Sequence, residues 1–372
     1  MTSHSKIPSL LSPYILSPPN DSLILLTNTL GTSANWLVIR YLCGALSSDA
    51  AAQRSKKSQD GQSRHDPDTN GEAEATDLAV VLVSWVRDFE FWRTETRRAA
   101  GIDLAYLAQS RRFAFVDGLT SLYSPSAPPI PPQSAREIPT RNVLGSPPPT
   151  RSIQPVRRSI IPNQGSVSTR LQREDVAQRS HPIAETTALS ENIKLSSTNL
   201  QQTQNLITKA IDSFPATMNV LLILDAPDLL LALQPDCTDL SSSASTSLSS
   251  LKFSLRLHEK VHSTILNLSA DINAPSSTLP PNHTPSPMET ESQAFLIGAA
   301  HQADLIIGCR GLDTGGAGDV SGVLRITTNN GSEATADVEH SNSPQGGWSE
   351  QELLYLVRND GTAKVWERGG DS

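Results

Sequence analysis

The feature that most constrains the fold is a set of short, continuous apolar runs that alternate with segments of helical patterning. Runs that are apolar at nearly every position are typical of strands buried on both faces of a parallel sheet. They read LILLT (23–27), AVVLV (79–83), FAFV (113–116), NVLLIL (219–224), TILNL (264–268) and DLIIG (304–308). The alternation predicts an α/β fold with a mostly parallel central sheet and helices on both faces.

The helical segments and the end of the chain support this prediction. Helices are expected at 36–46, 89–100, 200–214, 251–261 and 295–303. The clearest is 89–100, where Glu90 can pair with Arg93 and Gly101 is placed as a left-handed cap. Near the end, residues 322–328 with a neighbour and residues 353–357 with 363–366 predict antiparallel hairpins, the second turning at Asp360-Gly361.

Proline-rich and polar segments interrupt these patterns. The chain has 372 residues, 26 prolines and only 5% aromatic residues, and its prolines cluster. Segments of this composition cannot bury enough apolar surface to fold. We therefore predict one domain at 21–370 with no second folded domain. It follows a disordered N-terminus (1–20) and is interrupted by disordered insertions at about 48–77, 124–196 and 272–292. We expect a serine-rich loop at 241–250.

Charge and cysteine content exclude some classes of protein. The net charge is −8, so the chain as a whole is not a basic nucleic-acid binder. Cys43, Cys237 and Cys309 are too far apart to indicate a disulfide framework or a metal site. With no signal-peptide pattern and no apolar run of about 18 residues, we expect a soluble intracellular protein.

The loop after the first strand is where a fold of this type binds phosphates. A phosphate-binding loop needs several glycines and a lysine. Residues 27–35 (TNTLGTSAN) contain one glycine and no lysine, and the chain has none between Lys6 and Lys56. We therefore expect an ordinary strand-to-helix turn and no ATP hydrolysis by this chain alone. Asp225 ends an apolar strand, as a magnesium-binding acid does, but an acid that caps the strand end is the favoured interpretation.

Two other motifs resemble functional sites. His258-Glu259-Lys260-Val261-His262 matches the H-E-x-x-H zinc motif, which works when both histidines lie on one helix. No third ligand stands out, so a helix carrying two histidines by chance is favoured over a zinc hydrolase. Gly315, Gly316 and Gly318 precede a strand pattern rather than a helix, which favours a hairpin loop over a nucleotide site.

The segment 124–180 has a basic character of its own. It contains eight arginines and three acidic residues. Such an arm can contact RNA phosphates, but it lacks interleaved aromatic residues for base stacking. RNA contact and a solubilising linker both remain open.

Three segments resemble one known family. VLVSWVRDFEFWRTETRRAAGIDL (81–104), LLILDAPDLLLAL (221–233) and AAHQADLIIGCRGLDTGGAGDVSGVLRI (299–326) are similar to Elongator complex protein 6. The resemblance implies a single RecA-like domain without the phosphate-binding lysine, in agreement with the loop at 27–35. Insertions as long as those predicted here depart from shorter members of the family.

The resemblance also implies a function. It implies a non-catalytic subunit in a heterohexameric ring with Elongator subunits four and five. That ring assists the catalytic subcomplex in tRNA wobble-uridine modification and is thought to bind tRNA, in the cytoplasm and nucleus. We expect no cofactor. Arg310, Asp319 and Arg325 flank the glycine loop and are the candidate RNA or interface contacts, although each arginine can instead satisfy a local acid. A free-standing nucleotide-binding RecA-like ATPase is the alternative.

Overall fold

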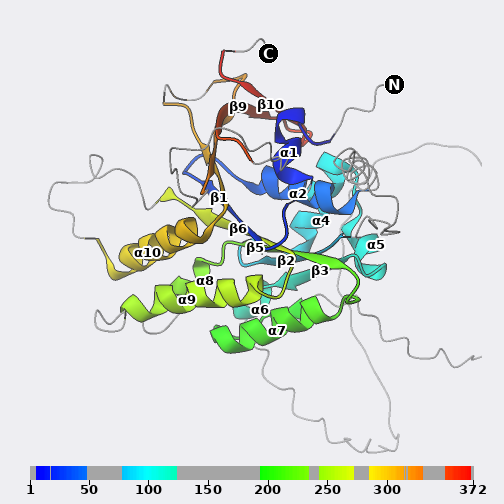
Figure 1. Ribbon diagram of the computed structural model, residues 1–372, viewed down its shortest axis with the longest axis vertical. Helices are drawn as coiled ribbons and strands as arrows, with labels where there is room; N and C mark the ends of the chain where they lie inside the picture. The colour runs from blue at the N-terminus through cyan, green and yellow to red at the C-terminus, as the bar shows by residue number, and fades with distance from the viewer. Residues whose placement is uncertain are drawn as a thin grey trace, which may run out of the picture. The chain divides into compact units, whose positions relative to one another are not determined.

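The computed structural model describes residues 6–16, 18–47, 78–123, 193–233, 243–271, 285–313, 315, 317–329 and 348–369. Within these ranges the strands form one ten-stranded sheet in the order β10-β9-β8-β7-β1-β6-β5-β2-β3-β4 (Figure 1). The strands are β1 (Ser22–Asn28), β2 (Leu78–Ser84), β3 (Phe113–Asp117), β4 (Ile193–Lys194), β5 (Asn219–Asp225), β6 (Ser263–Ser269), β7 (Leu305–Arg310), β8 (Gly322–Thr328), β9 (Gln351–Val357) and β10 (Ala363–Glu367). Neighbours from β7 to β4 pair in parallel, and β7 to β10 form an antiparallel meander.

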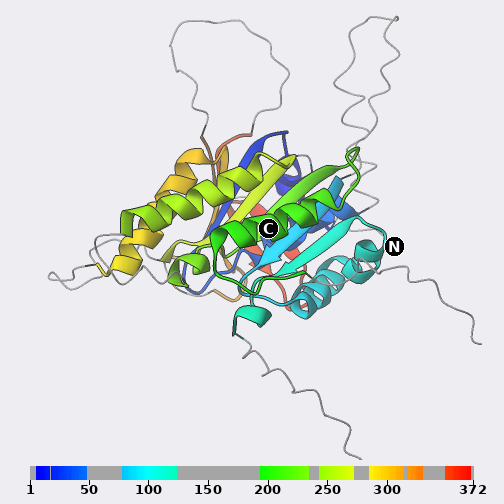
Figure 2. The same cartoon turned by 90° about the horizontal axis from the view of Figure 1, so that it is seen from below.

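Helices cover both faces of the sheet (Figures 1 and 2). One face carries η1 (Ser9–Leu11), α1 (Ser12–Ile15), α2 (Asn35–Leu46), α4 (Phe89–Ala100) and α5 (Leu104–Gln109). The other carries α7 (Leu200–Asp212), α8 (Leu229–Ala232), α9 (Ser243–His258) and α10 (Pro287–Gln302). The short helix α6 (Thr120–Tyr123) follows β3. The predicted α/β architecture is confirmed, with a mostly parallel central sheet, helices on both faces and antiparallel C-terminal strands.

Each apolar run contributes side chains to two hydrophobic cores, one on each face of the sheet. In β1, Ile24 and Leu26 enter the core beneath α2 and α4, while Leu23 and Leu25 enter the core beneath α9 and α10. Successive strand residues point to opposite faces, so a strand covered on both faces must be apolar throughout. This requirement explains the unbroken runs.

The caps of α4 confirm the sequence pattern there. Asp88 accepts a hydrogen bond from the Phe91 amide at 2.8 Å and begins the helix. Gly101 adopts φ 66° and donates its N–H to the Arg97 carbonyl at 2.9 Å. The Glu90–Arg93 pair is present at 2.8 Å.

The prediction of a disordered N-terminus is wrong for residues 6–16. Leu11, Tyr14 and Ile15 are buried against α2, and the Tyr14 hydroxyl donates to the Ser349 carbonyl at 2.8 Å. The prolines misled the prediction, because Pro13 stands at the start of α1, where its missing N–H costs nothing. The 3/4-residue spacing of the three apolar residues was the signal for a packed helix.

Three other boundaries also differ from the prediction. Residues 243–250, predicted as a loop, are the first half of α9, where Ser247 donates its amide to the buried Glu291 carboxylate of α10 at 2.7 Å. Residues 287–292 belong to α10, which begins at a capping box formed by Ser286 and Glu289. Residues 193–194 form β4. The predicted insertion 48–77 and most of the other two lie outside the described residues, as does Cys237.

The C-terminal strands differ from the prediction in their pairing. The β9–β10 hairpin is present, with Arg358 donating to the Thr362 carbonyl at 2.9 Å and Gly361 at φ 80°. The strand β8, however, pairs with both β7 and β9. The result is a continuous meander that extends the parallel sheet.

Candidate functional site

The turn after β1, residues 29–34, closes on itself. Thr32 donates its amide and its hydroxyl to the Thr29 carbonyl, at 2.9 and 2.7 Å, and Gly31 provides the left-handed residue at φ 83°. Thr29 donates its amide to the Cys309 carbonyl of β7 at 3.1 Å. The amides of Thr29 and Thr32, which a phosphate loop would turn toward its ligand, therefore have acceptors within the protein.

An acidic side chain lies beside the same turn. The Asp271 carboxylate accepts a hydrogen bond from the Leu30 amide, and Ser33 accepts one from the Asn35 amide at 3.2 Å. A carboxylate at this position repels a phosphate rather than attracting one. The expectation of an ordinary strand-to-helix turn is supported by these contacts. The Leu30 side chain is 88% exposed.

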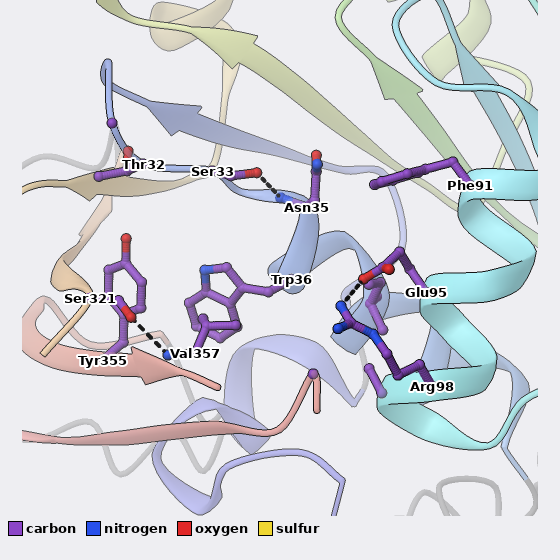
Figure 3. A pocket seen from close by; sticks show the side chains of 14 residues that line it. Thr32, Ser33, Asn35, Trp36, Phe91, Glu95, Arg98, Ser321, Tyr355 and Val357 are labelled. Carbon is purple, nitrogen blue, oxygen red and sulfur yellow. Dashed lines mark hydrogen bonds and ion pairs between the residues drawn. The ribbon is translucent and has the colours of Figure 1, made fainter. Parts of the chain in front are cut away.

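A cavity of about 230 Å³ adjoins this turn, and we call it the β1-turn cavity (Figure 3). Its lining residues are Gly31, Thr32, Ser33, Asn35, Trp36, Ile39, Phe91, Glu95, Arg98, Ala99, Ser321, Tyr355, Val357 and Gly361. Trp36 stacks on Tyr355 with ring centroids 5.1 Å apart. The two charged lining residues are engaged, because Arg98 bonds to Glu95 and to the Asn359 carbonyl. The cavity is mainly apolar and offers no uncommitted cation for a phosphate among the residues that line it.

Cys309 lies near this stacked pair but is not a nucleophile. The side chain is buried, and burial raises the pKa of its thiol to about 12, against the opposing effect of hydrogen bonds with Trp36 and Tyr355. Burial also raises the pKa of the Cys43 thiol. A thiol that stays protonated at neutral pH does not attack substrates.

A polar row crosses the C-terminal ends of four parallel strands. Its members are Asp117, Ser84, Asp225 and Asn267, which pair in register across β3, β2, β5 and β6. The Asp225 carboxylate, 2% exposed, accepts bonds from the Ser84 hydroxyl at 2.6 Å and the Asn267 amide at 2.7 Å. Asp117 accepts the amides of Leu119 and Thr120, each at 2.9 Å.

These contacts support the interpretation of Asp225 as an acid that completes the strand end. Burial raises its pKa, and the bonds from Ser84 and Asn267 oppose that rise. The neighbouring Asp228 has a pKa raised to about 6, mainly by burial. Among the described residues, no group of three His, Cys, Asp or Glu side chains is arranged to hold a metal ion. The sequence revealed Asp225, but not its partners, because their proximity depends on strand order.

The histidines of the H-E-x-x-H motif do not share a helix. The helix α9 ends at His258, so the expected helix with both histidines is incorrect. The His258 ring is 3.1 Å from the Thr264 hydroxyl, whereas the His262 ring is 3.2 Å from the Pro18 carbonyl. Each imidazole has its own structural contact, and the geometry on which a zinc hydrolase depends is missing here.

The three predicted contact residues lie around the loop between β7 and β8. Arg310, at the end of β7, binds Asp313 at 3.0 Å and Glu352 at 3.6 Å. Arg325 is exposed on β8, in register with Gly308 and Glu352, and Asp319 is exposed in the loop. A strand follows this loop, as predicted. Residues 314 and 316 lie outside the described part of the chain.

A second cavity, of about 390 Å³, was not evident from the sequence. It is lined by Lys6, Arg40, Arg358 and Lys364, together with Ala99, Asp360, Thr362 and Ala363, and we call it the basic cavity. Ala99 lines both cavities. Its cations come from the N-terminal segment, α2 and the β9–β10 hairpin, which only the fold brings together.

The fold and these sites define an α/β protein with a mostly parallel sheet, whose β1 turn is closed by its own residues. No protein-family model matches the sequence, and no curated protein matches it significantly. Among solved structures, the chain is similar to a KaiC-like protein from the hyperthermophilic archaeon Pyrococcus horikoshii OT3. The identity is 10% and the TM-score 0.43, over 97% of each chain. A similarity at this level says nothing about activity. No helix in the described ranges is long and apolar enough to cross a membrane.

Proposed function

We propose that this chain is a non-catalytic subunit of the Elongator complex. In this proposal it forms a heterohexameric ring with subunits four and five that supports modification of the tRNA wobble uridine. The observation that carries the proposal is the β1 turn. Its Thr29 and Thr32 amides bond within the protein, Asp271 lies beside it, and it has no lysine. Such a chain can occupy a position in a RecA-like ring without hydrolysing ATP.

The segments that resemble the Elongator complex protein 6 family support this assignment by where they lie. Residues 81–104 span β2 and α4, residues 221–233 span β5 and α8, and residues 299–326 include β7 and most of β8. The strands β2 and β5 are neighbours, as are β7 and β8. The resemblance therefore falls on two pairs of neighbouring strands, with β1 and β6 between the pairs.

The ring is tested by co-expressing the full-length chain with Elongator subunits four and five and measuring the mass of the purified product. We expect a stable assembly of six chains. The full-length chain purified without its partners should not hydrolyse ATP. A chain that remains monomeric beside both partners would overturn the ring assignment, and ATP turnover by the isolated chain would favour a free-standing ATPase.

Binding of tRNA by the assembled ring is the second part of the proposal. Among the described residues, Arg325 has no carboxylate within ion-pair distance, whereas Arg310 is already paired with Asp313 and Glu352. Arg325 is thus the better candidate for a phosphate contact. Arg325→Ala should weaken tRNA binding by rings, and the slope of log affinity against log salt concentration should decrease by about one. Arg310→Ala should have a smaller effect. Unchanged binding in both variants would exclude this surface.

A further inference from the structure

The basic cavity concentrates positive charge that its one acidic residue neutralises only in part. Four of its lining side chains, Lys6, Arg40, Arg358 and Lys364, are cationic, and only Asp360 is anionic. Within the described residues none of the four cations forms an ion pair. The Asp360 carboxylate is occupied, because it accepts the Thr362 amide at 2.9 Å and the Thr362 hydroxyl at 2.7 Å.

Arg40 is the buried member of this group. Its side chain is 1% exposed, and its guanidinium donates to the carbonyls of Ala99, at 3.3 Å, and Gly361. Its Nε has no hydrogen-bond partner within the described structure. The guanidinium also interacts with the Cys43 side chain and the Asp360 carboxylate, but burial outweighs both and lowers the Arg40 pKa. Burying a cation is costly, and a further nearby anion lowers that cost.

The C-terminal end of α4 accounts for only part of this charge. Arg40 bonds to Ala99 in the last turn of α4, and the Lys6 ammonium lies beside Gly101, the residue that caps α4. Cations are favoured at that end of a helix dipole. Arg358 and Lys364, however, come from opposite sides of the β9–β10 turn and are exposed at the cavity. The helix end gives no reason for these two charges.

We propose that the basic cavity binds a phosphate-bearing small molecule. Lys6, Arg358 and Lys364 would contact the phosphate oxygens, and Arg40 would supply buried positive charge behind them. Ala99 and Ala363 provide apolar wall for the remainder of the ligand. The volume of about 390 Å³ lies in the range of small-molecule pockets. A concave site of this size, rather than an extended stripe of cations, favours a compact phosphate compound over an RNA strand.

The proposal is tested with inorganic pyrophosphate as the probe. Calorimetric titration of the purified full-length chain at low ionic strength should show one site per chain. Arg358→Gln combined with Lys364→Gln, both at exposed positions, should weaken binding by at least about tenfold. The matched control removes one lysine and one arginine from the exposed surface of α9, as Lys252→Gln with Arg256→Gln, and should alter affinity by less than about twofold.

Several results would overturn the proposal. These are no binding by the unmodified chain, equal losses in the two double variants, and binding that the cavity variant leaves unchanged. A short single-stranded RNA that binds through Arg358 and Lys364 and is not displaced by pyrophosphate would assign the surface to a nucleic acid instead. Circular dichroism of each variant distinguishes lost binding from lost folding. The titration uses the chain without partners, so its outcome is independent of ring assembly.

Discussion

The polar row and the basic cavity both contain ionisable side chains from distant parts of the chain, but these side chains differ in the partners they have within the protein. In the polar row, Asp225 receives bonds from Ser84 and Asn267. In the basic cavity, Arg358 and Lys364 lie beside two further cations and have no ion-pair partner among the described residues. A polar group whose bonds are complete stabilises the fold, whereas a cluster of like charges is prepared for an anion.

The β1-turn cavity and the basic cavity show that the place of a cavity in the fold does not determine the charge of its lining. The β1-turn cavity adjoins a strand-to-helix turn, a position where α/β folds often bind phosphate, yet its Arg98 is bound by Glu95 and the Asn359 carbonyl. The basic cavity begins on the other side of Ala99 and has the charges that the first cavity lacks. An expectation based on the position of a loop in a fold class therefore misses the cavity that four cationic side chains line.

The largest effect is expected from Gly361→Ala, which changes the β9–β10 turn beside both cavities. Gly361 adopts φ 80°, and an added Cβ would lie 2.6 Å from the Ala99 Cβ. Strain and overpacking together should lower the free energy of unfolding by about 3 kcal/mol, measured by urea denaturation. Gly31→Ala is the control: it has φ 83° and open space, so backbone strain alone should cost about 1 kcal/mol. Equal losses would show that the close approach to Ala99 is unimportant.

The next effect concerns Asp228, beside the polar row. Its pKa is raised to about 6 by burial, so the folded state holds its proton more tightly than the unfolded state, where the pKa is near 3.8. The stability due to this proton is complete below pH 4 and is lost as the pH rises through 6. Asp228→Asn should therefore change little at pH 4 and raise the free energy of unfolding by about 2 kcal/mol at pH 8.

Denaturation of both proteins across this pH range checks the prediction for Asp228. The exposed Asp212→Asn, at the end of α7, is the control and should show no comparable gain at pH 8. A difference between Asp228→Asn and the unmodified chain that does not vary with pH would show that Asp228 is not the titrating group.

A smaller effect is expected from Ser84→Ala in the polar row. The Ser84 hydroxyl donates to Asp225 at 2.6 Å and accepts the Arg87 amide at 2.9 Å. Loss of the hydroxyl should lower the free energy of unfolding by about 1.5 kcal/mol at neutral pH. The cost should decrease when Asp225 is protonated in acid, because the bond favours the charged carboxylate. Ser33→Ala, at an exposed position in the β1 turn, should cost less than about 0.5 kcal/mol. Equal losses of stability in Ser84→Ala and Ser33→Ala would show that the hydrogen bonds of the polar row do not stabilise the fold.

Much of the sheet could be predicted from the sequence because local patterns determine it. Strands buried on both faces must be apolar throughout, and Gly101 and Asp360-Gly361 carry their own turn preferences. The errors arose where tertiary contacts override composition. Serine is a weak helix former, yet α9 begins in a serine-rich segment, where the Ser247 amide donates to the buried Glu291 carboxylate of α10 at 2.7 Å.

The sites were less predictable than the fold. The strand-to-helix turn after β1 could be predicted from the absence of lysine, which is a local property of residues 27–35. The basic cavity could not be predicted, because Lys6, Arg40 and Lys364 are far apart in sequence. They meet only when the N-terminal segment packs beside α2 and the β9–β10 hairpin folds back. Lys6 was the least predictable of these residues, because it lies in the proline-rich N-terminus, which was predicted to be disordered.

The smallest predicted effect concerns salt and the basic cavity. Clustered cations repel one another, and added salt screens that repulsion. In a buffer without phosphate, the unmodified chain should therefore gain stability as sodium chloride rises, by less than about 1 kcal/mol. Arg358→Gln with Lys364→Gln should reduce this gain, whereas Lys252→Gln with Arg256→Gln on α9 should not. Thermal unfolding across a salt series measures the difference. The same gain in both variants would mean that Arg358 and Lys364 do not repel the other cations. The contrast between the basic cavity and the polar row would then rest on Lys6 and Arg40.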